Sequence, residues 1–352
     1  MNTTLQKYTL PTGYLFTDDY SKGKLETLSI GDYGKHYNVK ADFLGYTRPL
    51  DGVPNTWCMP LSEKWVVTLS TQYGCPMRCT FCDVPKVEWR GNATVEDLKK
   101  QLYTAIELFQ GTQYTERLNI HFARMGDPIF NANVFSFARW CYINKHTIYD
   151  ETGLRIETLH PVLTTSLPRK FKQLEARIME WCEIKNELYN GQAGLQFSVN
   201  STCENQRSEM FDGLSLTLQE FSKIAARMPE PVSRKYCLNF AYSTDYEIDA
   251  SRVRTLFDPN KFMCKITPIH NNNACAENGI KTVGGYEHFA PYAQPEQALR
   301  EAGFDVLVFV PSIDEEDGLV TCGNAILGGS TLKTSTQVIK IHGLEKTEDV
   351  TA

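Results

Sequence analysis

The fold is decided by the stretch Ser70-Thr71-Gln72-Tyr73-Gly74-Cys75-Pro76-Met77-Arg78-Cys79-Thr80-Phe81-Cys82. It places three cysteines in a CxxxCxxC spacing, and clustered thiolates are soft ligands for zinc or for an iron–sulfur cluster. A closed zinc site takes four ligands, and the sequence has neither a second CxxC pair nor a nearby HxxxH to complete one. We therefore expect Cys75, Cys79 and Cys82 to hold a 4Fe-4S cluster with one iron free of protein ligands. A zinc knuckle completed by a distant Cys or His is the alternative.

An iron without a protein ligand is a site for a chelating small molecule. The amino and carboxylate groups of S-adenosylmethionine suit such an iron, and one electron then breaks this cofactor into methionine and a 5′-deoxyadenosyl radical. The stretch resembles the cluster loop of the radical S-adenosylmethionine superfamily, including the aromatic Phe81 just before the third cysteine. The resemblance implies that Phe81 lies against the adenine of the cofactor and that a flavodoxin- or ferredoxin-type protein donates the electron.

The composition is that of an ordinary globular protein. The chain has 352 residues, of which 42% are hydrophobic and 22% charged, enough for one large α/β barrel or two ordinary domains. It has no run of about 18 apolar residues and no signal-peptide core at its start, so we expect a cytoplasmic protein that neither spans a membrane nor is secreted. The net charge of −6 lowers the odds of an RNA partner, because contacts of basic side chains with phosphates dominate nucleic-acid affinity. It does not exclude such a partner.

From Trp65 onward, strand-like apolar runs alternate with helical patterns about six times. This alternation predicts a parallel sheet with helices outside it, and the superfamily named above has an open barrel of six strand–helix units. We expect an α/β fold with a partial (β/α)6 barrel over 61–330, a small β-rich cap over 1–60 and a tail over 331–352. The expected strands are Trp65–Leu69, Leu118–Ala123, Leu159–Thr165, Leu195–Val199, Tyr236–Tyr242 and Phe262–Pro268, with Val306–Val310 as an extension. The expected helices cover 94–110, 132–145, 169–188, 217–228, 249–257 and 294–302.

Residues suited to ligand binding follow these strands. In parallel barrels the chemistry collects at the C-terminal ends of the strands. The cysteine loop follows the first strand, Gly126 and Asp127 follow the second, and Asn271–Asn273 follow the sixth. Ser166 ends the third strand, and Ser198 and Asn200 end the fourth. We expect these positions to meet at one end of the sheet.

The same positions resemble those of one family within the superfamily, the RlmN/Cfr-type enzymes that methylate adenine in RNA. Met125-Gly126-Asp127-Pro128 is similar to the family's Met-Gly-Glu-Pro, and Ser198-Val199-Asn200 is similar to its Ser-Ile-His. Thr164-Thr165-Ser166 resembles a run with a cofactor-binding serine, and Asn272 matches its ribose-binding asparagine. The resemblance implies that Gly126, Asp127, Ser166, Ser198, Asn200 and Asn272 bind S-adenosylmethionine.

A further cysteine, Cys322, lies in Cys322-Gly323-Asn324 after the acidic stretch 314–317. The RlmN/Cfr-type family ends with a similar acidic loop and Cys-Gly-Gln. The resemblance implies that Cys322 accepts a methyl group and then delivers it to an sp² carbon, and a deprotonated thiol is a strong nucleophile for the first step. An inert structural cysteine is the alternative.

Two departures from the family keep other functions open. Thr68 stands where the family has a second thiol, and a hydroxyl is far less acidic than a thiol. Cys58 is the nearest other cysteine in sequence. Because the cysteine loop begins early in this sequence, we expect no counterpart of the family's N-terminal helical domain. The alternatives are therefore a radical enzyme that abstracts hydrogen from a small molecule or peptide without methyl transfer, and a zinc-stabilised RNA-binding protein.

Overall fold

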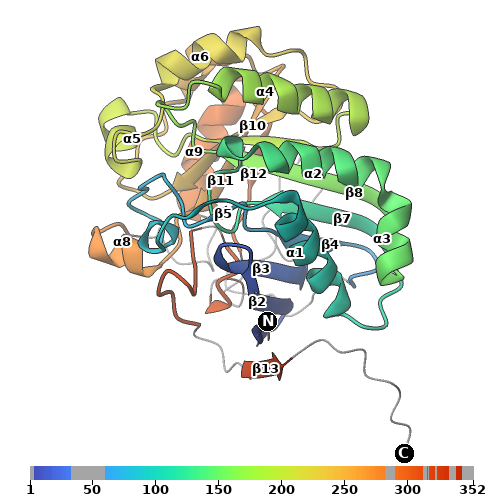
Figure 1. The fold of residues 1–352 in the computed structure, drawn as a ribbon. Helices are drawn as coiled ribbons and strands as arrows, with labels where there is room; N and C mark the ends of the chain where they lie inside the picture. The colour runs from blue at the N-terminus through green and yellow to red at the C-terminus, as the bar shows by residue number, and fades with distance from the viewer. Residues whose placement is uncertain are drawn as a thin grey trace, which may run out of the picture.

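The computed structural model describes residues 4–32, 60–281, 290–311, 315, 317–321, 323–332 and 338–342. Within these residues, one large sheet runs through the molecule with the strand order β12-β11-β10-β9-β8-β7-β4-β3-β2-β1-β13 (Figure 1). A second, two-stranded sheet pairs β5 (Gln72–Tyr73) with β6 (Gly91–Asn92) beside the cysteine loop.

Seven neighbouring strands of the large sheet are parallel, and each of them overlaps a predicted run, which confirms the predicted parallel sheet; β7 and β8 begin four residues earlier than predicted. From β4 to β12, every pair of adjacent strands is hydrogen-bonded in parallel register. The strands are β4 (Trp65–Thr68), β7 (Tyr114–Phe122), β8 (Arg155–Thr165), β9 (Gly194–Ser198), β10 (Tyr236–Tyr242), β11 (Phe262–Pro268) and β12 (Val306–Val308).

Three N-terminal strands extend this sheet on the β4 side. β1 (Thr4–Leu10), β2 (Gly13–Tyr20) and β3 (Gly23–Gly31) pair antiparallel in sequence, β3 pairs antiparallel with β4, and β13 (Val338–His342) adds to β1. The strands of the expected cap are therefore hydrogen-bonded to the parallel strands. Residues 33–59, including Cys58, lie outside the described residues, and the division at residues 60 and 330 stays a prediction.

Helices cover one face of the parallel strands and bury a shared apolar core. Figure 1 shows α1, α2 and α4 running alongside β4, β7 and β8. Trp65, Ile120 and Phe122 on the strands join Leu102 and Trp181 on the helices in one buried cluster. The helices are α1 (Val95–Glu107), α2 (Ala132–Ile143), α3 (Lys145–Thr152), α4 (Leu174–Glu183), α5 (Glu204–Met210), α6 (Leu218–Arg227), α7 (Ala250–Leu256), α8 (Asn273–Glu277) and α9 (Ala290–Glu301).

The best-defined helix start is the predicted one at Thr94. The Thr94 side chain accepts from the Asp97 backbone at 3.0 Å, and the Asp97 carboxylate accepts from the Thr94 backbone at 2.8 Å. This reciprocal capping box satisfies two backbone donors that a helix end otherwise leaves open. Three short helices, α3, α5 and α8, were not predicted, because segments of eight, seven and five residues show too little periodicity to see in sequence.

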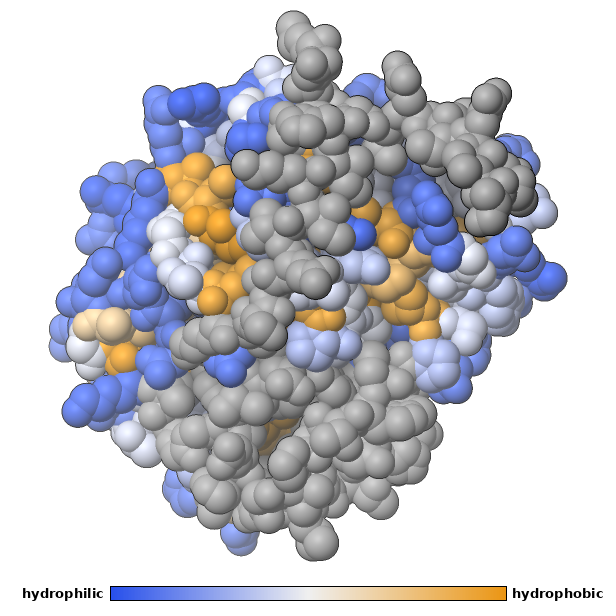
Figure 2. All heavy atoms as spheres, turned by 90° about the horizontal axis from the view of Figure 1, so that it is seen from below, coloured by the Kyte–Doolittle hydropathy of each residue, from blue (hydrophilic) through white to orange (hydrophobic). Residues whose placement is uncertain are grey.

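The face seen from below the view of Figure 1 is mixed in character. Seen from below, hydrophobic patches lie among hydrophilic side chains of the described residues (Figure 2). Within the described part of the chain, no helix combines the length and apolar character needed to cross a bilayer.

Candidate active site

The three cysteines of the CxxxCxxC stretch lie near one another in the loop after β4. Burial raises the pKa of the Cys79 thiol well above its usual range, and the nearby Cys82, Cys75 and Asp127 raise it further. In the described residues, no three His, Cys, Asp or Glu side chains meet around a single metal ion. A four-iron cluster does not need three ligands around one metal ion, because its cysteine ligands bind different irons. The nine cysteines of the described residues are free thiols.

The start of the loop is held by a glycine that no other residue could replace without strain. Gly74 has φ +74°, and a Cβ there would lie 2.7 Å from the Val87 carbonyl oxygen and 2.9 Å from the Trp89 Cα. The segment that returns after the third cysteine therefore packs directly on the residue before Cys75. Glycine permits both the left-handed backbone and the close approach.

The end of the loop is held by Asp83, which follows Cys82 and is fully buried. Its carboxylate accepts from the Ala274 backbone at 2.9 Å and from the Ser330 hydroxyl at 2.6 Å. Its own backbone N–H donates to the Gly323 carbonyl at 2.8 Å. One residue thus joins the cysteine loop to the start of α8 and to the C-terminal loop.

The predicted Gly126 and Asp127 connect the ends of β7 and β8. Gly126 has φ +88°, and a Cβ there would lie 2.5 Å from the Gln72 Cβ. One Asp127 oxygen accepts from the Ser166 backbone and hydroxyl, both at 2.7 Å, and from the Thr165 hydroxyl at 3.1 Å. Burial raises the pKa of Asp127, while the hydrogen bonds from Ser166 oppose that rise. The structure thus brings Asp127 and Ser166 together, with the carboxylate already holding the turn after β8.

Asn200, after β9, is a predicted site residue whose side-chain amide is only half satisfied by the described residues. It is 1% exposed, has φ +63°, and its Oδ1 accepts from the Ala241 backbone at 3.1 Å. Its buried Nδ2 has no hydrogen-bond partner among the described residues. An unsatisfied buried donor costs about 1–3 kcal/mol, so an acceptor on a bound molecule would relieve this cost.

A buried arginine that the sequence analysis missed supports the end of β9. Arg207 on α5 donates to the carbonyls of Ser198 at 2.7 Å and Val199 at 2.6 Å, and to the Ser215 hydroxyl. Burial lowers the pKa of Arg207 to about 10, which leaves it cationic at neutral pH. No local sequence pattern marks Arg207, because its partners are backbone carbonyls at the end of β9 and a hydroxyl in the loop after α5.

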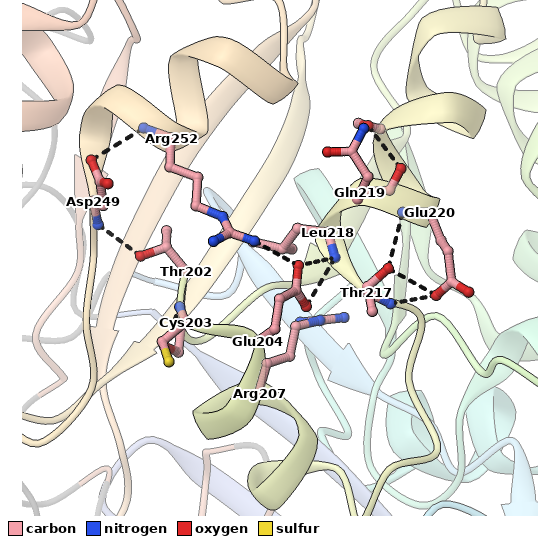
Figure 3. Close-up of polar contacts among 12 residues, drawn as sticks. Thr202, Cys203, Glu204, Arg207, Thr217, Leu218, Gln219, Glu220, Asp249 and Arg252 are labelled. Carbon is pink, nitrogen blue, oxygen red and sulfur yellow. Dashed lines mark hydrogen bonds and ion pairs between the residues drawn. The ribbon is translucent and has the colours of Figure 1, made fainter.

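The helix that carries Arg207 is fixed in turn by caps shared with its neighbours (Figure 3). Glu204 accepts from the Leu218 backbone at 3.0 Å and from Arg252 at 2.9 Å, which joins α5 to α6 and α7. Thr217 and Glu220 form a capping box at the start of α6. This network positions Arg207 and, through it, Ser198.

Asn272, after β11, lies between the cysteine loop and the C-terminal loop. Its amide donates to the carbonyls of Phe81 at 3.0 Å and Gly323 at 3.2 Å, and its Oδ1 accepts from the Cys275 backbone at 2.9 Å. The Phe81 ring packs edge-on to Phe211, with 5.6 Å between centroids. Asn272 and Phe81 are therefore neighbours, as the predicted cofactor site requires.

A buried ion pair anchors the C-terminal loop to the sheet. Arg124 donates to Glu26 at 3.0 and 2.8 Å, and both side chains are almost fully buried. Arg124 also donates to the Leu319 carbonyl at 2.6 Å, and Glu26 accepts from the Leu327 backbone at 2.6 Å. The two anchored residues flank Cys322, which itself lies outside the described residues.

The chain is similar to known proteins over part of its length. No family model matches the chain. It is 33% identical over 73 residues to the probable dual-specificity RNA methyltransferase RlmN of Chlorobaculum tepidum, which is 21% of this chain and 20% of that protein. It is 22% identical over 224 residues to the protein of the same name from Petrotoga mobilis, which is 62% of this chain and 58% of that protein. The chain resembles RlmN, a radical S-adenosylmethionine enzyme. The alignment with each of these RlmN proteins spans less than two thirds of that protein's length.

The RlmN-like chain also shares its fold with a solved structure. The crystal structure of a radical SAM methyltransferase from Sphaerobacter thermophilus matches with a TM-score of 0.53 and 16% identity, over 92% of this chain and 76% of that one. At this identity the match is evidence of fold alone. It agrees with the mostly parallel α/β sheet found here.

The residue that departs from the RlmN pattern, Thr68, lies beside a histidine. Thr68 on β4 is the register neighbour of His121 on β7. Val67 and Ile120 belong to the helix-packed core, so Thr68 and His121 face the other side of the sheet, because successive strand residues alternate. Burial lowers the pKa of His121 to about 3, helped by four cations. These cations are Lys265, Lys64, Arg234 and Arg117.

Proposed function

We propose that this chain is a radical S-adenosylmethionine enzyme that methylates an sp² carbon, with adenine in RNA as the substrate that its relatives' names suggest. Cys75, Cys79 and Cys82 would hold a 4Fe-4S cluster. The observation that carries the proposal is the meeting of the cysteine loop with Asn272, whose amide bonds the Phe81 carbonyl. Phe81 lies in the first third of the sequence, whereas Asn272 and the C-terminal loop lie in the last third. Methyl transfer needs all three at one place.

The residues present fit the cofactor. The buried Asn200 amide lacks an acceptor among the described residues, and a carboxylate or ribose oxygen would satisfy it. The Phe81 ring is half-buried and suits stacking on adenine. When bound, the cluster and S-adenosylmethionine together supply the 5′-deoxyadenosyl radical.

The chain's own residues have distinct roles in this proposal. Asp127 and Ser166 hold the turns after β7 and β8 where the methionine end of the cofactor would lie. Arg207 fixes the end of β9, so that Ser198 and Asn200 keep their orientation. Cys322 would be the methyl acceptor, and S-adenosylmethionine would supply the methyl group there and leave as S-adenosylhomocysteine.

Anaerobic reconstitution tests the proposal. The wild-type protein should bind about four irons and four sulfides per chain, as a 4Fe-4S cluster requires, and should make 5′-deoxyadenosine when reduced with dithionite. Cys79→Ala should lose both properties. Zinc near one per chain with no sulfide would overturn the assignment in favour of a zinc-stabilised protein.

The methyl-carrier step has a separate test. After incubation with methyl-labelled S-adenosylmethionine, the peptide that contains Cys322 should carry a labelled methyl group, and Cys322→Ala should not. Cys203→Ala is the matched control, because Cys203 is a half-buried thiol at the start of α5. A wild-type peptide without label would remove Cys322 from the mechanism.

Thr68 favours a second candidate function, hydrogen abstraction from a small molecule or peptide without methyl transfer. Thr68 has no thiol to release a methylated base, and its register neighbour is His121. The two functions differ in the fate of the label. Methyl label in the product supports the first, whereas 5′-deoxyadenosine without labelled product supports the second.

A further inference from the structure

Arg207 on α5 is a buried cation whose hydrogen bonds all end on uncharged oxygens. It is 2% exposed, and it donates to three backbone carbonyls and to the Ser215 hydroxyl. Glu204 lies on the same helix, but its carboxylate pairs with Arg252 at 2.9 Å (Figure 3). In the part of the chain that the structure describes, no carboxylate forms an ion pair with Arg207. Its positive charge is therefore not cancelled by a direct partner.

The helix that carries Arg207 ends against the cysteine loop. Met210 is the last residue of α5, and its carbonyl accepts from the Thr80 backbone at 2.9 Å and from the Thr80 hydroxyl at 3.3 Å. Thr80 directly follows Cys79 in the sequence. The Met210 side chain belongs to a buried apolar cluster against which Cys79 packs. These contacts fix the position of α5 relative to the proposed cluster ligands.

An aromatic ring connects the guanidinium to the same loop. The guanidinium carbon of Arg207 lies 4.8 Å from the centroid of the Phe211 ring. Phe211 in turn packs edge-on to Phe81, which lies between Cys79 and Cys82. The contacts therefore run from the cation through Phe211 to the segment that joins two of the proposed cluster ligands.

The charges of Arg207 and Cys79 interact across these buried side chains. Burial lowers the pKa of Arg207 to about 10, and the negative charge of a Cys79 thiolate is among those that oppose this fall. With that pKa the guanidinium is charged at neutral pH. Because an electrostatic interaction is mutual, the cation also favours negative charge at Cys79. Burial, Cys82, Cys75 and Asp127 raise the pKa of the Cys79 thiol, so the cation offsets part of what disfavours negative charge there.

Reduction of a cluster held by three thiolates adds one electron and one negative charge, with no bond made or broken. A fixed cation near the sulfurs favours the more negative, reduced state, and local charge is one of the factors that set the reduction potential of iron–sulfur clusters. The effect of a buried charge is large, because the protein interior weakens electrostatic interactions less than water does. Salt screens such a charge much less than an exposed one.

We propose that Arg207 raises the reduction potential of the cluster at the cysteine loop by holding a fixed positive charge beside Cys79. The inference rests on the proposed function, because it requires a cluster there. Arg207 acts through the cluster ligands, as a positioning residue, and its bonds to the Ser198 and Val199 carbonyls keep the charge in place. The electron that breaks the cofactor then enters at a higher potential than it would without this cation.

The test measures the midpoint potential of the reconstituted full-length protein in Arg207→Gln and Arg207→Lys. Both variants lose the planar guanidinium and part of its hydrogen bonds, but only Arg207→Gln loses the positive charge. At a fixed potential, the ratio of reduced to oxidised cluster in Arg207→Gln should fall roughly tenfold, which corresponds to about 59 mV for one electron. Arg207→Lys should stay close to the wild type. A titration in which dithionite supplies the electron, followed by absorbance and electron paramagnetic resonance, gives these values.

Arg78→Gln is the matched control. It makes the same chemical change within the cysteine loop, but the Arg78 side chain is 68% exposed and pairs with Asp212 at 2.7 Å. Water and salt weaken the effect of an exposed charge, so the shift in midpoint potential should be small and should vanish at high ionic strength. The shift of Arg207→Gln should persist there.

Glu204→Gln tests the sign of the effect. It removes a negative charge from α5 and keeps an oxygen that can accept from the Leu218 backbone. The midpoint potential should rise, and by less than it falls in Arg207→Gln, because Glu204 is half-buried and paired with Arg252. Disturbance of α5 alone would move the two variants in the same direction.

The outcomes separate the inference from the proposed function. Equal midpoint potentials in the wild type and Arg207→Gln overturn the inference and leave the proposed function intact. Equal falls in Arg207→Gln and Arg207→Lys also overturn it, because the lost hydrogen bonds then account for the change. If Arg207→Gln does not fold, Glu204→Gln decides, and a potential that is unchanged or lowered overturns the inference. A wild-type protein that forms no cluster overturns the proposed function itself.

Discussion

Asn272 donates its side-chain amide to the backbone carbonyl of Phe81 at 3.0 Å, across 191 positions of sequence. The same amide reaches the Gly323 carbonyl at 3.2 Å. Through this one side chain, the loop with the three cysteines and the loop with Cys322 share a support. Any chemistry that passes a methyl group between the two loops depends on their relative position, and Asn272 is one of the residues that sets it.

Asn272→Asp should loosen the C-terminal loop. Aspartate keeps the oxygen that accepts from the Cys275 backbone at the start of α8, but it replaces the amide donor with an oxygen facing two carbonyls. We expect a loss of about 1–3 kcal/mol of stability and faster limited proteolysis within 317–332. Asn273→Asp is the control, because the bond that its amide makes among the described residues, to the Gly329 carbonyl, is exposed. Equal proteolysis of the two variants would contradict the role given to Asn272.

Asp127→Asn should weaken the junction of β7 and β8. Both Asp127 oxygens accept hydrogen bonds, one from Thr165 and Ser166 and the other from the Ile129 backbone, whereas asparagine offers a single acceptor oxygen and turns the second position into a donor. We expect a loss of about 1–3 kcal/mol in urea unfolding, and a smaller loss, about 1 kcal/mol, for Ser166→Ala. The double variant should cost less than the sum of the two, because both substitutions remove the same hydrogen bond. Simple additivity would show that the contact is not made in solution.

Glu26→Gln should be among the most damaging single substitutions. It leaves Arg124 charged and buried with a neutral partner, and breaking a buried pair costs about 3–5 kcal/mol. Glu96→Gln is the control, because its pair with Lys99 is exposed and should contribute at most about 1 kcal/mol. Chemical unfolding at neutral pH measures both. Similar losses for the two variants would mean that the Glu26–Arg124 pair is hydrated in solution.

Stability should fall as the pH drops below about 6.5 because of His121. Burial and nearby cations lower its folded pKa to about 3, whereas an unfolded histidine titrates near 6.5. Between these values the unfolded state binds one more proton, so the free energy of unfolding rises with pH in this window and is level above it. Each pH unit below 6.5 should cost about 1.4 kcal/mol. His160, whose pKa burial lowers to about 4, acts in the same direction.

His121→Gln should flatten this slope between pH 6.5 and 5 in urea unfolding of the protein. The matched control is His146→Gln on the exposed side of α3, which removes an imidazole without touching the sheet. An unchanged slope in His121→Gln would show that another group carries the pH dependence.

The sequence by itself determined the parallel strands and the cysteine loop. Apolar runs such as Tyr236–Tyr242 and Phe262–Pro268 are read directly from neighbouring residues, and they match β10 and β11. The spacing of Cys75, Cys79 and Cys82 is equally local, and so is the capping box of Thr94 and Asp97. Local patterns predict local structure because the periodicity and the capping bonds join residues a few positions apart.

Only the tertiary structure decided how distant segments meet at the site. Glu26 with Arg124, Asp83 with Ser330, and Asn272 with Phe81 each join residues from 98 to 247 positions apart. Arg207 and the antiparallel pairing of β3 with β4 belong to the same group, since nothing in the neighbouring sequence marks the partner. The physical reason is that a side-chain hydrogen bond across the fold forms only after chain segments have packed, so its partner is set by the sheet order and not by the residues beside it.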